Sequence, residues 1–133
     1  MTSLNDTQIQ AIAKGHDTVS IKDLEIVMQN YLEENSFNNL EILLSDASIL
    51  CLDIDHLLDK IIQRKEGGYC FEHNKLFFHY LKSSGFDSQA LLARVVYARD
   101  IDAPRTHRFS IITLDKQRYL VDVGFGPYTP SRP

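Results

Sequence analysis

The chain has few cysteines, no long apolar run and no strong excess of charge. Its 133 residues include two cysteines, which are too few for a disulfide framework, so a reducing compartment, the cytoplasm, is expected. No stretch approaches the ~18 apolar residues of a membrane helix, and residues 1–6 lack the basic and apolar regions of a signal peptide. Fourteen Lys and Arg against 18 Asp and Glu give a net charge of −4, which argues against a nucleic-acid or anionic-membrane partner.

What the sequence does contain is typical of a globular protein with two kinds of secondary structure. Hydrophobic residues make up 44% of the chain and charged residues 24%, as in ordinary soluble domains. Helical spacing of apolar residues dominates as far as Gly85, and strand and turn patterns follow it, which predicts an α+β fold with a helical domain over 1–84 and a β domain over 85–133. The predicted helices cover 6–14, 20 to the turn at 35–39, 55–64 and 70–84, and the predicted strands cover 88–98, 107–114 and 118–123.

The stretch around two adjacent glycines carries the strongest chemical signal. Gly67 and Gly68 permit a sharp turn and the close approach of a ligand, and Cys70 follows them at the predicted start of a helix. A helix N-terminus favours a thiolate, and its free N–H groups can receive an oxyanion. Cys70 is thus either a nucleophile or a small buried hydrophobe. Cys51 has no such setting and is expected to be a buried structural thiol.

A thiolate nucleophile needs a base, and the sequence offers five histidines. His73 shares a helical face with Cys70 and is one candidate, either as the base or as half of a metal site. The sequence has no second Cys/His pair at ligand spacing, so no metal is expected. His16 and His56 are expected to be solvated, and His79 lies too far along the helix for direct contact with Cys70.

His107 and Asp122 offer the alternative arrangement. A two-residue turn at 115–116 would place His107 opposite Gly124 and Asp122 opposite Phe109, with all four on one sheet face. The imidazole and the carboxylate would then be diagonal neighbours within hydrogen-bonding reach. A three-residue turn would put them on opposite faces. Asp122 could instead be a turn residue at a strand end, although it lies in an apolar run where a carboxylate needs a partner.

Cys70, His107 and Asp122 have the chain order of a thiol acyl-transfer triad. In this hypothesis Cys70 attacks an acyl carbonyl, His107 transfers the protons, and Asp122 orients the imidazole. The resting state would be an ion pair between the thiolate of Cys70 and the imidazolium of His107.

These residues occur in a pattern that resembles the arylamine N-acetyltransferase family. The family pattern Arg-x-x-Gly-Gly-x-Cys-x-Glu matches at Arg64, Gly67, Gly68, Cys70 and Glu72. The family's histidine motif matches at 106–107, and its Val-Asp-Val-Gly-Phe-Gly run matches 121–126 letter for letter. Residues 36–40 resemble the family's Pro-Phe-Glu-Asn-Leu loop, and the whole resemblance covers about 24–130.

The resemblance implies a papain-like cysteine fold, in which an N-terminal helical bundle carries the nucleophile and a partial antiparallel β-barrel follows. It also implies a ping-pong reaction: acetyl-CoA acetylates Cys70, an aromatic amine or hydrazine then takes the acetyl group, and His107 and Asp122 complete the triad. By position, the residues that would line the aryl pocket, unless they simply pack in the core, are Phe37, Phe125 and either Val95 or Val96. The residues that would support the nucleophile are Arg64, Gly67, Gly68 and Glu72.

The chain departs from the family pattern in its loop and in its length. Ser36 and Asn38 replace Pro and Glu, which removes a carboxylate that could pair with Arg64. A buried Arg64 would need another acceptor, and the candidates are Glu66, Glu72 and Asp23. The chain is also shorter than members of the family, so the later strands of the second domain and the whole third, C-terminal domain are expected to be absent and activity to be reduced.

A chain that ends there would leave a sheet edge and apolar faces uncovered. Exposed edges and apolar patches drive association, which predicts a homo-oligomer in which one chain covers another. Two further functions fit the sequence as well. One is a non-catalytic or ligand-binding remnant of the enzyme, and the other is a cysteine hydrolase of the same superfamily that uses water as the acceptor.

Overall fold

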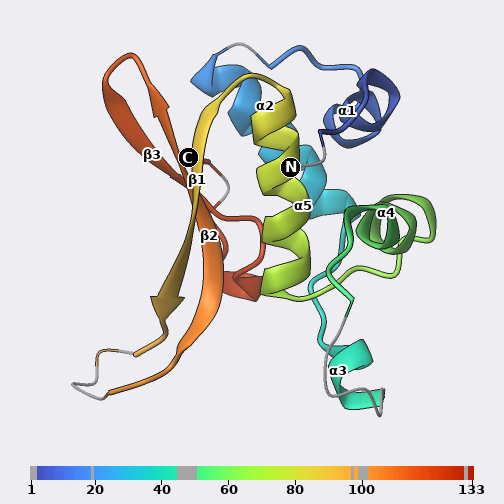
Figure 1. Ribbon diagram of the computed structural model, residues 1–133, viewed down its shortest axis with the longest axis vertical. Helices are drawn as coiled ribbons and strands as arrows, with labels where there is room; N and C mark the ends of the chain where they lie inside the picture. Colours follow the sequence, from blue (N-terminus) through green and yellow to red (C-terminus); the bar gives the residue numbers. More distant parts are fainter. Residues whose placement is uncertain (1–2, 19, 45–50, 97, 99–101, 131) are drawn as a thin grey trace.

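The computed structural model describes residues 3–18, 20–44, 51–96, 98, 102–130 and 132–133. In the described residues, helices precede strands (Figure 1). The helical segments are α1 (Asp6–Ala13), α2 (Ile21–Glu34), α3 (Leu40–Leu44), α4 (Ile54–Leu57), the π-helix η1 (Leu58–Gln63) and α5 (Cys70–Ser83). The strands are β1 (Asp87–Arg94), β2 (Arg105–Leu114) and β3 (Gln117–Val121), and the 3₁₀ turn η2 (Gly126–Tyr128) follows them.

Local hydrogen bonds explain where the first two helices begin. In α2, the Ser20 hydroxyl accepts a hydrogen bond from the N–H of Asp23, and the Asp23 carboxylate accepts one from the N–H of Ser20. The same reciprocal pair forms between Asn5 and Gln8 at the start of α1. Each reciprocal pair is a capping box, which satisfies backbone N–H groups that the first turn of a helix leaves free.

The helix predicted over 55–64 is present but changes type in the middle. α4 covers its first turn, and the wider turns of the π-helix η1 follow. Of the four residues whose spacing predicts an inward face, Leu57, Leu58 and Ile61 are buried and Ile62 is partly buried. Lys60 is buried with them and is only 4% exposed. The short helix α3 has no counterpart among the predicted helices, and none of its residues is buried.

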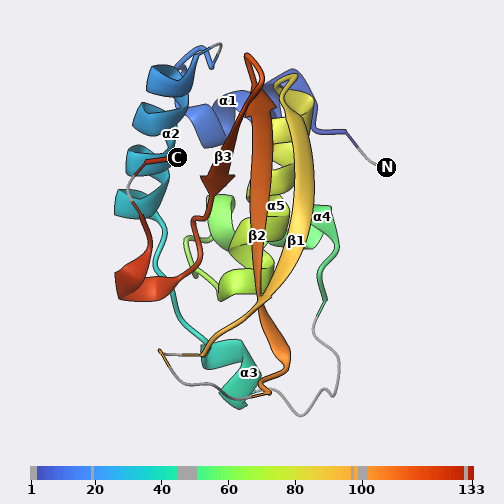
Figure 2. The same ribbon diagram turned by 90° about the vertical axis from the view of Figure 1, so that its left-hand side faces the viewer.

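The three strands form an antiparallel sheet with β2 in the middle (Figure 2). β2 and β3 are joined by a two-residue turn, in which Asp115 and Lys116 have φ angles of 50° and 64°. Positive φ at both positions is what a type I′ hairpin turn requires. Leu114 is consequently paired with Gln117, and the two-residue turn predicted from the sequence is confirmed.

α5 is the central element of the molecule. Figures 1 and 2 show the sheet packed on one side of α5, with α4 on the opposite side and α2 along another. A single hydrophobic core includes Leu76 and Phe77 of α5, Ile112 of β2 and Val123 beyond β3. Because helices and strands share this core, the first residue of α5 is held in a fixed position against the sheet.

The α+β class is confirmed, since the described helices precede Gly85 and the strands follow it. Closure of the sheet into a partial barrel stays a prediction, and so does the division into domains 1–84 and 85–133. Leu92 and Leu120 of the sheet are 50% and 47% exposed, and association of two copies through such a surface also stays a prediction. Within the described ranges, every helix is too short or too polar to cross a bilayer.

Candidate active site

Cys70 is the first residue of α5, and the loop before α3 holds the turn that leads to it. Phe37 and Gly68 form a parallel β-bridge, and the N–H of Gly68 donates to the carbonyl of Ser36 at 3.1 Å. Gly67 has a φ of 70°, and a Cβ at this position would overlap the Ser36 carbonyl. The sequence pattern predicts that a ligand approaches the two glycines closely. In the structure, the group that approaches Gly67 closely is the chain's own residue Ser36.

The side chains of Cys70, His107 and Asp122 meet where α5 packs against the sheet. Nε2 of His107 lies 2.5 Å from Oδ2 of Asp122, and Cys70 is near enough to the His107 ring to raise the pKa of the imidazole. The Cys70 Sγ lies 3.5 Å from the carbonyl oxygen of Thr106, the residue before His107. Cys70 is partly exposed, whereas His107 and Asp122 are buried, so the sulfur is accessible while the pair behind it is shielded from water.

Asn74, one helical turn after Cys70, ties the acidic residue to α5. Its Nδ2 donates to Oδ1 of Asp122 at 2.9 Å and to the carbonyl of Arg108 at 2.6 Å. Its Oδ1 accepts a hydrogen bond from the N–H of Val123 at 3.0 Å. The buried amide thus joins β2, the segment after β3 and the helix that begins with Cys70. The sequence places Asn74 near Cys70, but it holds no signal for these contacts across the sheet.

The surroundings favour a charged imidazole beside a charged carboxylate. Burial lowers the pKa of His107, but hydrogen bonds with Asp122 and Cys70, together with their negative charges, outweigh burial and raise this pKa to about 9. Burial raises the pKa of Asp122, but hydrogen bonds from His107, Asn74 and the N–H of Gly124 outweigh burial and lower it. Both groups are therefore ionised throughout the neutral range.

We expect the free energy of unfolding to fall above neutral pH because of His107. Its pKa rises from 6.5 to about 9 on folding, so its protonated form stabilises the fold fully below pH 6.5, and this contribution is lost as the pH rises through 9. Asp122 acts in the opposite sense: its pKa is lowered from 3.8, so its contribution is present above that pH and is lost only as the pH falls further.

Urea unfolding of the wild-type protein and of His107→Gln, measured from about pH 5 to about pH 9.5, checks this expectation. The wild-type protein should lose more stability than the variant between pH 6.5 and 9. Parallel curves for the two proteins over this interval would contradict it.

His73, the other candidate base, lies in a different environment. Its Nδ1 is 2.8 Å from the hydroxyl of Tyr31, and its Nε2 is 2.9 Å from the carbonyl oxygen of Ser36. Burial lowers the pKa of His73, so the ring is neutral, donates from Nε2 to the carbonyl and accepts at Nδ1 from the tyrosine. Both ring nitrogens are engaged, and His73 therefore fixes the loop at Ser36 and has no free nitrogen to offer Cys70.

Cys70 and His107 open into a pocket of about 270 Å³. Its lining consists of Phe37, Cys70, Val95, Thr106, His107, Gly124, Phe125, Gly126 and Pro127. The Phe125 ring lies against the imidazole, with 4.6 Å between the two ring centroids. The residues expected to line an aryl pocket, Phe37, Phe125 and Val95, all border this cavity, and their part in binding a substrate stays a prediction.

The ion pairs of Arg64 and Glu72, the charged residues expected to support the nucleophile, involve different partners from one another. Arg64 is exposed, and its guanidinium pairs with Asp59 at 2.7 Å and with Glu66 at 2.6 Å. Of the three acceptors considered for Arg64, Glu66 is therefore the one that the structure brings to it. Glu72 is buried and binds Lys60 at 2.7 Å instead. The family motif draws attention to Arg64, and nothing in the sequence pattern singles out Lys60.

Two expectations about other side chains are wrong. Cys51 is exposed rather than buried. His56 is partly buried rather than solvated, and its Nε2 has no hydrogen-bond partner among the described residues. Possible metal-ligand atoms of Glu41, His56 and Glu72 lie within 4.8 Å of one another, but the ammonium of Lys60 already binds both carboxylates.

Comparisons with known proteins agree on one family. The family model described as N-acetyltransferase matches residues 20–133. The arylamine N-acetyltransferase of Mycolicibacterium smegmatis is 40% identical over 124 residues, which are 90% of this chain and 45% of that protein. The arylamine N-acetyltransferase / N-hydroxyarylamine O-acetyltransferase of Salmonella typhimurium is 38% identical over 98 residues, which are 73% of this chain and 34% of that protein.

Solved structures give the same result. The arylamine N-acetyltransferase of Mycobacterium abscessus superposes with a TM-score of 0.85 at 28% identity, over 98% of this chain and 45% of that one. An enzyme from Bacillus cereus, described as having a unique Cys-His-Glu catalytic triad, superposes with a TM-score of 0.83 at 31% identity, over 98% and 53% of the two chains. This chain spans about half or less of these relatives, and its match over residues 20–133 shows that it belongs to the arylamine N-acetyltransferase family.

Proposed function

We propose that the chain transfers an acetyl group from acetyl-CoA to the nitrogen of an arylamine or arylhydrazine through an acetyl-cysteine intermediate on Cys70. The observation that carries this proposal is the meeting of Cys70, the buried ion pair of His107 and Asp122, and an aromatic pocket in one place. Membership of the family supports the same chemistry.

In the first half-reaction, the thiolate of Cys70 attacks the thioester carbonyl of acetyl-CoA. Negative charge develops on the carbonyl oxygen, and backbone N–H groups in the first turn of α5 are the donors that we assign to it. As the intermediate collapses, the carbon–sulfur bond to coenzyme A breaks, and the leaving thiolate takes the proton of His107. Asp122 keeps the ring oriented and stabilises its positive charge before the transfer.

In the second half-reaction, the nitrogen of the acceptor attacks the acetyl-cysteine. His107, now neutral, takes the proton that the nitrogen loses, and the thiolate of Cys70 leaves, which restores the resting ion pair. Phe37 and Phe125 border the space in front of the sulfur and offer flat apolar surfaces to an aryl ring. An aromatic acceptor suits this lining better than a charged aliphatic one.

Intact-mass measurement after incubation with acetyl-CoA tests the proposal. We expect the chain to gain the mass of one acetyl group, to keep it in the absence of amine, and to lose it when aniline is added. Protein whose Cys70 has been replaced by alanine provides the matched control and should gain nothing, although Cys51 remains exposed in it.

Other outcomes of the same measurement would contradict the proposal. Loss of the acetyl group without an amine would favour a cysteine hydrolase. Absence of an adduct, in protein whose Cys70 still reacts with iodoacetamide, would favour a non-catalytic chain.

A further inference from the structure

Lys60 is connected by hydrogen bonds to the turn that precedes Cys70. It belongs to the π-helix η1 and is 4% exposed. Its Nζ donates to Oε2 of Glu72 at 2.7 Å and also binds the carboxylate of Glu41 in α3. Glu72 is 1% exposed, so Lys60 supplies the positive charge that its carboxylate needs in a buried position.

Glu72 connects Lys60 to Tyr69, the residue before Cys70. While Oε2 binds Lys60, Oε1 accepts a hydrogen bond from the N–H of Tyr69 at 3.2 Å. The carboxylate also packs closely under Gly68, where an added Cβ would lie 2.9 Å from Oε1. Each carboxylate oxygen of Glu72 therefore binds a different partner. The ion pair with Lys60 holds the carboxylate in the orientation in which Oε1 accepts from the N–H of Tyr69.

The backbone of Lys60 contacts the other end of the same turn. Its carbonyl accepts a hydrogen bond from the N–H of Glu66 at 3.0 Å. Lys60 thus reaches the turn twice, through its carbonyl at Glu66 and through its ammonium and Glu72 at Tyr69. A side-chain substitution at Lys60 removes the second of these contacts and leaves the first in place.

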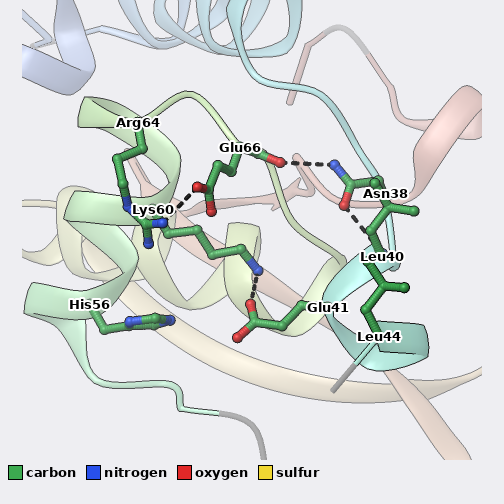
Figure 3. Close-up of a pocket in the computed structure, with 8 residues that line it drawn as sticks. All are labelled: Asn38, Leu40, Glu41, Leu44, His56, Lys60, Arg64 and Glu66. Atoms are coloured by element: carbon green, nitrogen blue, oxygen red, sulfur yellow. Dashed lines mark hydrogen bonds and ion pairs between the residues drawn. The ribbon is translucent and has the colours of Figure 1, made fainter.

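The sequence motif suggests Arg64 as the cation that supports the nucleophile. Arg64 is exposed, however, and pairs with Asp59 and Glu66 rather than with Glu72. Figure 3 shows Arg64 and Lys60 on the wall of one pocket of about 610 Å³, with Arg64 turned to Glu66 and Lys60 turned to Glu41. Asn38 stands where the family loop carries Glu, and its Nδ2 donates to the Glu66 carbonyl at 3.0 Å. With that carboxylate missing, Arg64 pairs at the surface, and the buried cation is Lys60.

The ammonium remains charged in this setting. Burial lowers the pKa of Lys60, but hydrogen bonds and attraction from Glu41 and Glu72 outweigh burial and raise it. Removal of the ammonium would leave the carboxylate of Glu72 buried without a cation. Such a group turns towards water where it can, and Oε1 would then leave the N–H of Tyr69.

We propose that Lys60 is a positioning residue for the nucleophile, which holds Glu72 in the orientation that fixes the Tyr69–Cys70 turn against His107. The proposal rests on the proposed function of Cys70 as the nucleophile. It concerns the placing of the sulfur and does not require Lys60 to touch a substrate.

The test compares Lys60→Met with Lys65→Met, both in a Cys51→Ser background so that only Cys70 reacts with iodoacetamide. Lys65 belongs to the same turn but is exposed and makes one long contact to Glu34 at 3.4 Å, so its replacement is a matched loss of charge. We expect Lys60→Met to slow alkylation at pH ~6 by about tenfold or more, since a displacement of 1 Å can reduce a rate by ~10²-fold. Lys65→Met should stay within about twofold of the parent.

The pH profile and the kinetics separate positioning from a general loss of folding. In Lys60→Met, the alkylation rate should rise mainly above pH ~8, as for an ordinary thiol, and kcat for acetyl transfer should fall while KM for acetyl-CoA stays near the parent value. Circular dichroism and thermal unfolding report the folded fraction at each assay temperature. A folded Lys60→Met protein with the parent pH profile would overturn the proposal.

A double-mutant cycle with Glu72→Gln gives a second measurement that does not depend on the stability of the single variant. The amide oxygen of Gln can still accept from the N–H of Tyr69, and the double variant holds no unpaired carboxylate at this position. Because Lys60 acts through Glu72, replacement of Lys60 should change the alkylation rate by less than about twofold in the Glu72→Gln background. An undiminished effect of Lys60→Met in that background would refute this route of action.

The two proposals can fail separately. Alkylation requires no acetyl-CoA, so a parent protein that alkylates rapidly at pH ~6 but takes up no acetyl group would refute the proposed function and still decide the role of Lys60. A parent rate that rises only above pH ~8 and is the same in Lys60→Met would overturn both.

Discussion

Replacement of Asp122 with Asn is expected to lower the rate of acetyl-cysteine formation by about 10³–10⁴-fold while the protein stays folded. The carboxylate accepts hydrogen bonds from His107, Asn74 and the N–H of Gly124. An amide of the same shape carries no charge and presents two N–H donors, so one of these three donors loses its acceptor. The imidazolium of His107 also loses the negative charge that raises its pKa to about 9.

The rate of coenzyme A release in the first turnover, measured in a rapid-mixing experiment, reports this step directly. Asp115→Asn is the matched control, because it makes the same chemical change at the exposed hairpin turn on the same pair of strands, where Asp115 has a φ of 50°. Asn accepts this backbone conformation readily, so the control should keep the parent rate. A loss of less than about tenfold in Asp122→Asn would mean that the carboxylate does not orient His107 in the reaction.

Replacement of Gly124 with Ala is expected to destabilise the protein by about 1–3 kcal/mol and to slow acetyl transfer by about 10²-fold. A Cβ at Gly124 would lie 2.9 Å from the Cα of Cys70 and 3.0 Å from Nδ2 of Asn74. The first contact is with backbone, which cannot rotate away. The segment after β3 must therefore move off α5, and Asp122, two residues earlier, moves with it.

Gly15→Ala is the control for this substitution. Gly15 has a φ of 78°, and a Cβ there would meet no atom within 4 Å, so the change strains the backbone without touching the site. Both variants should lower the midpoint of urea unfolding, but only Gly124→Ala should slow the alkylation of Cys70 by iodoacetamide. Equal alkylation rates in the two variants would show that the close packing at Gly124 does not hold the site together.

The parts of the site that could be predicted from the sequence depend on local rules. Glycines before an apolar helical pattern place Cys70 at a helix start, and this follows from backbone preferences alone. A polar pair between two β-rich runs gives a two-residue turn, and the turn alone fixes which residues of β2 and β3 share a face. The local sequence of one hairpin is therefore enough to predict that His107 and Asp122 lie close together.

The parts that could not be predicted depend on contacts between distant segments. Lys60 is buried in the π-helix η1, where Glu41 and Glu72 both pair with it, and the spacing of apolar residues indicates neither of these contacts. Asn74 gains its partners only when α5 packs on the sheet. Cys51, which the sequence predicts to be buried, is exposed.

The type I′ turn also has a consequence for the order in which the molecule acquires its reactivity during folding. His107 and Asp122 are 15 residues apart and belong to one hairpin, and isolated hairpins form in about 1–10 μs. Cys70 joins them only when α5 docks on the sheet, a step that requires contacts between residues far apart in the chain. In a refolding chain, Cys70 would therefore lack the imidazole of His107 until docking, and a change in its reaction with a short pulse of iodoacetamide would mark the moment at which the core closes.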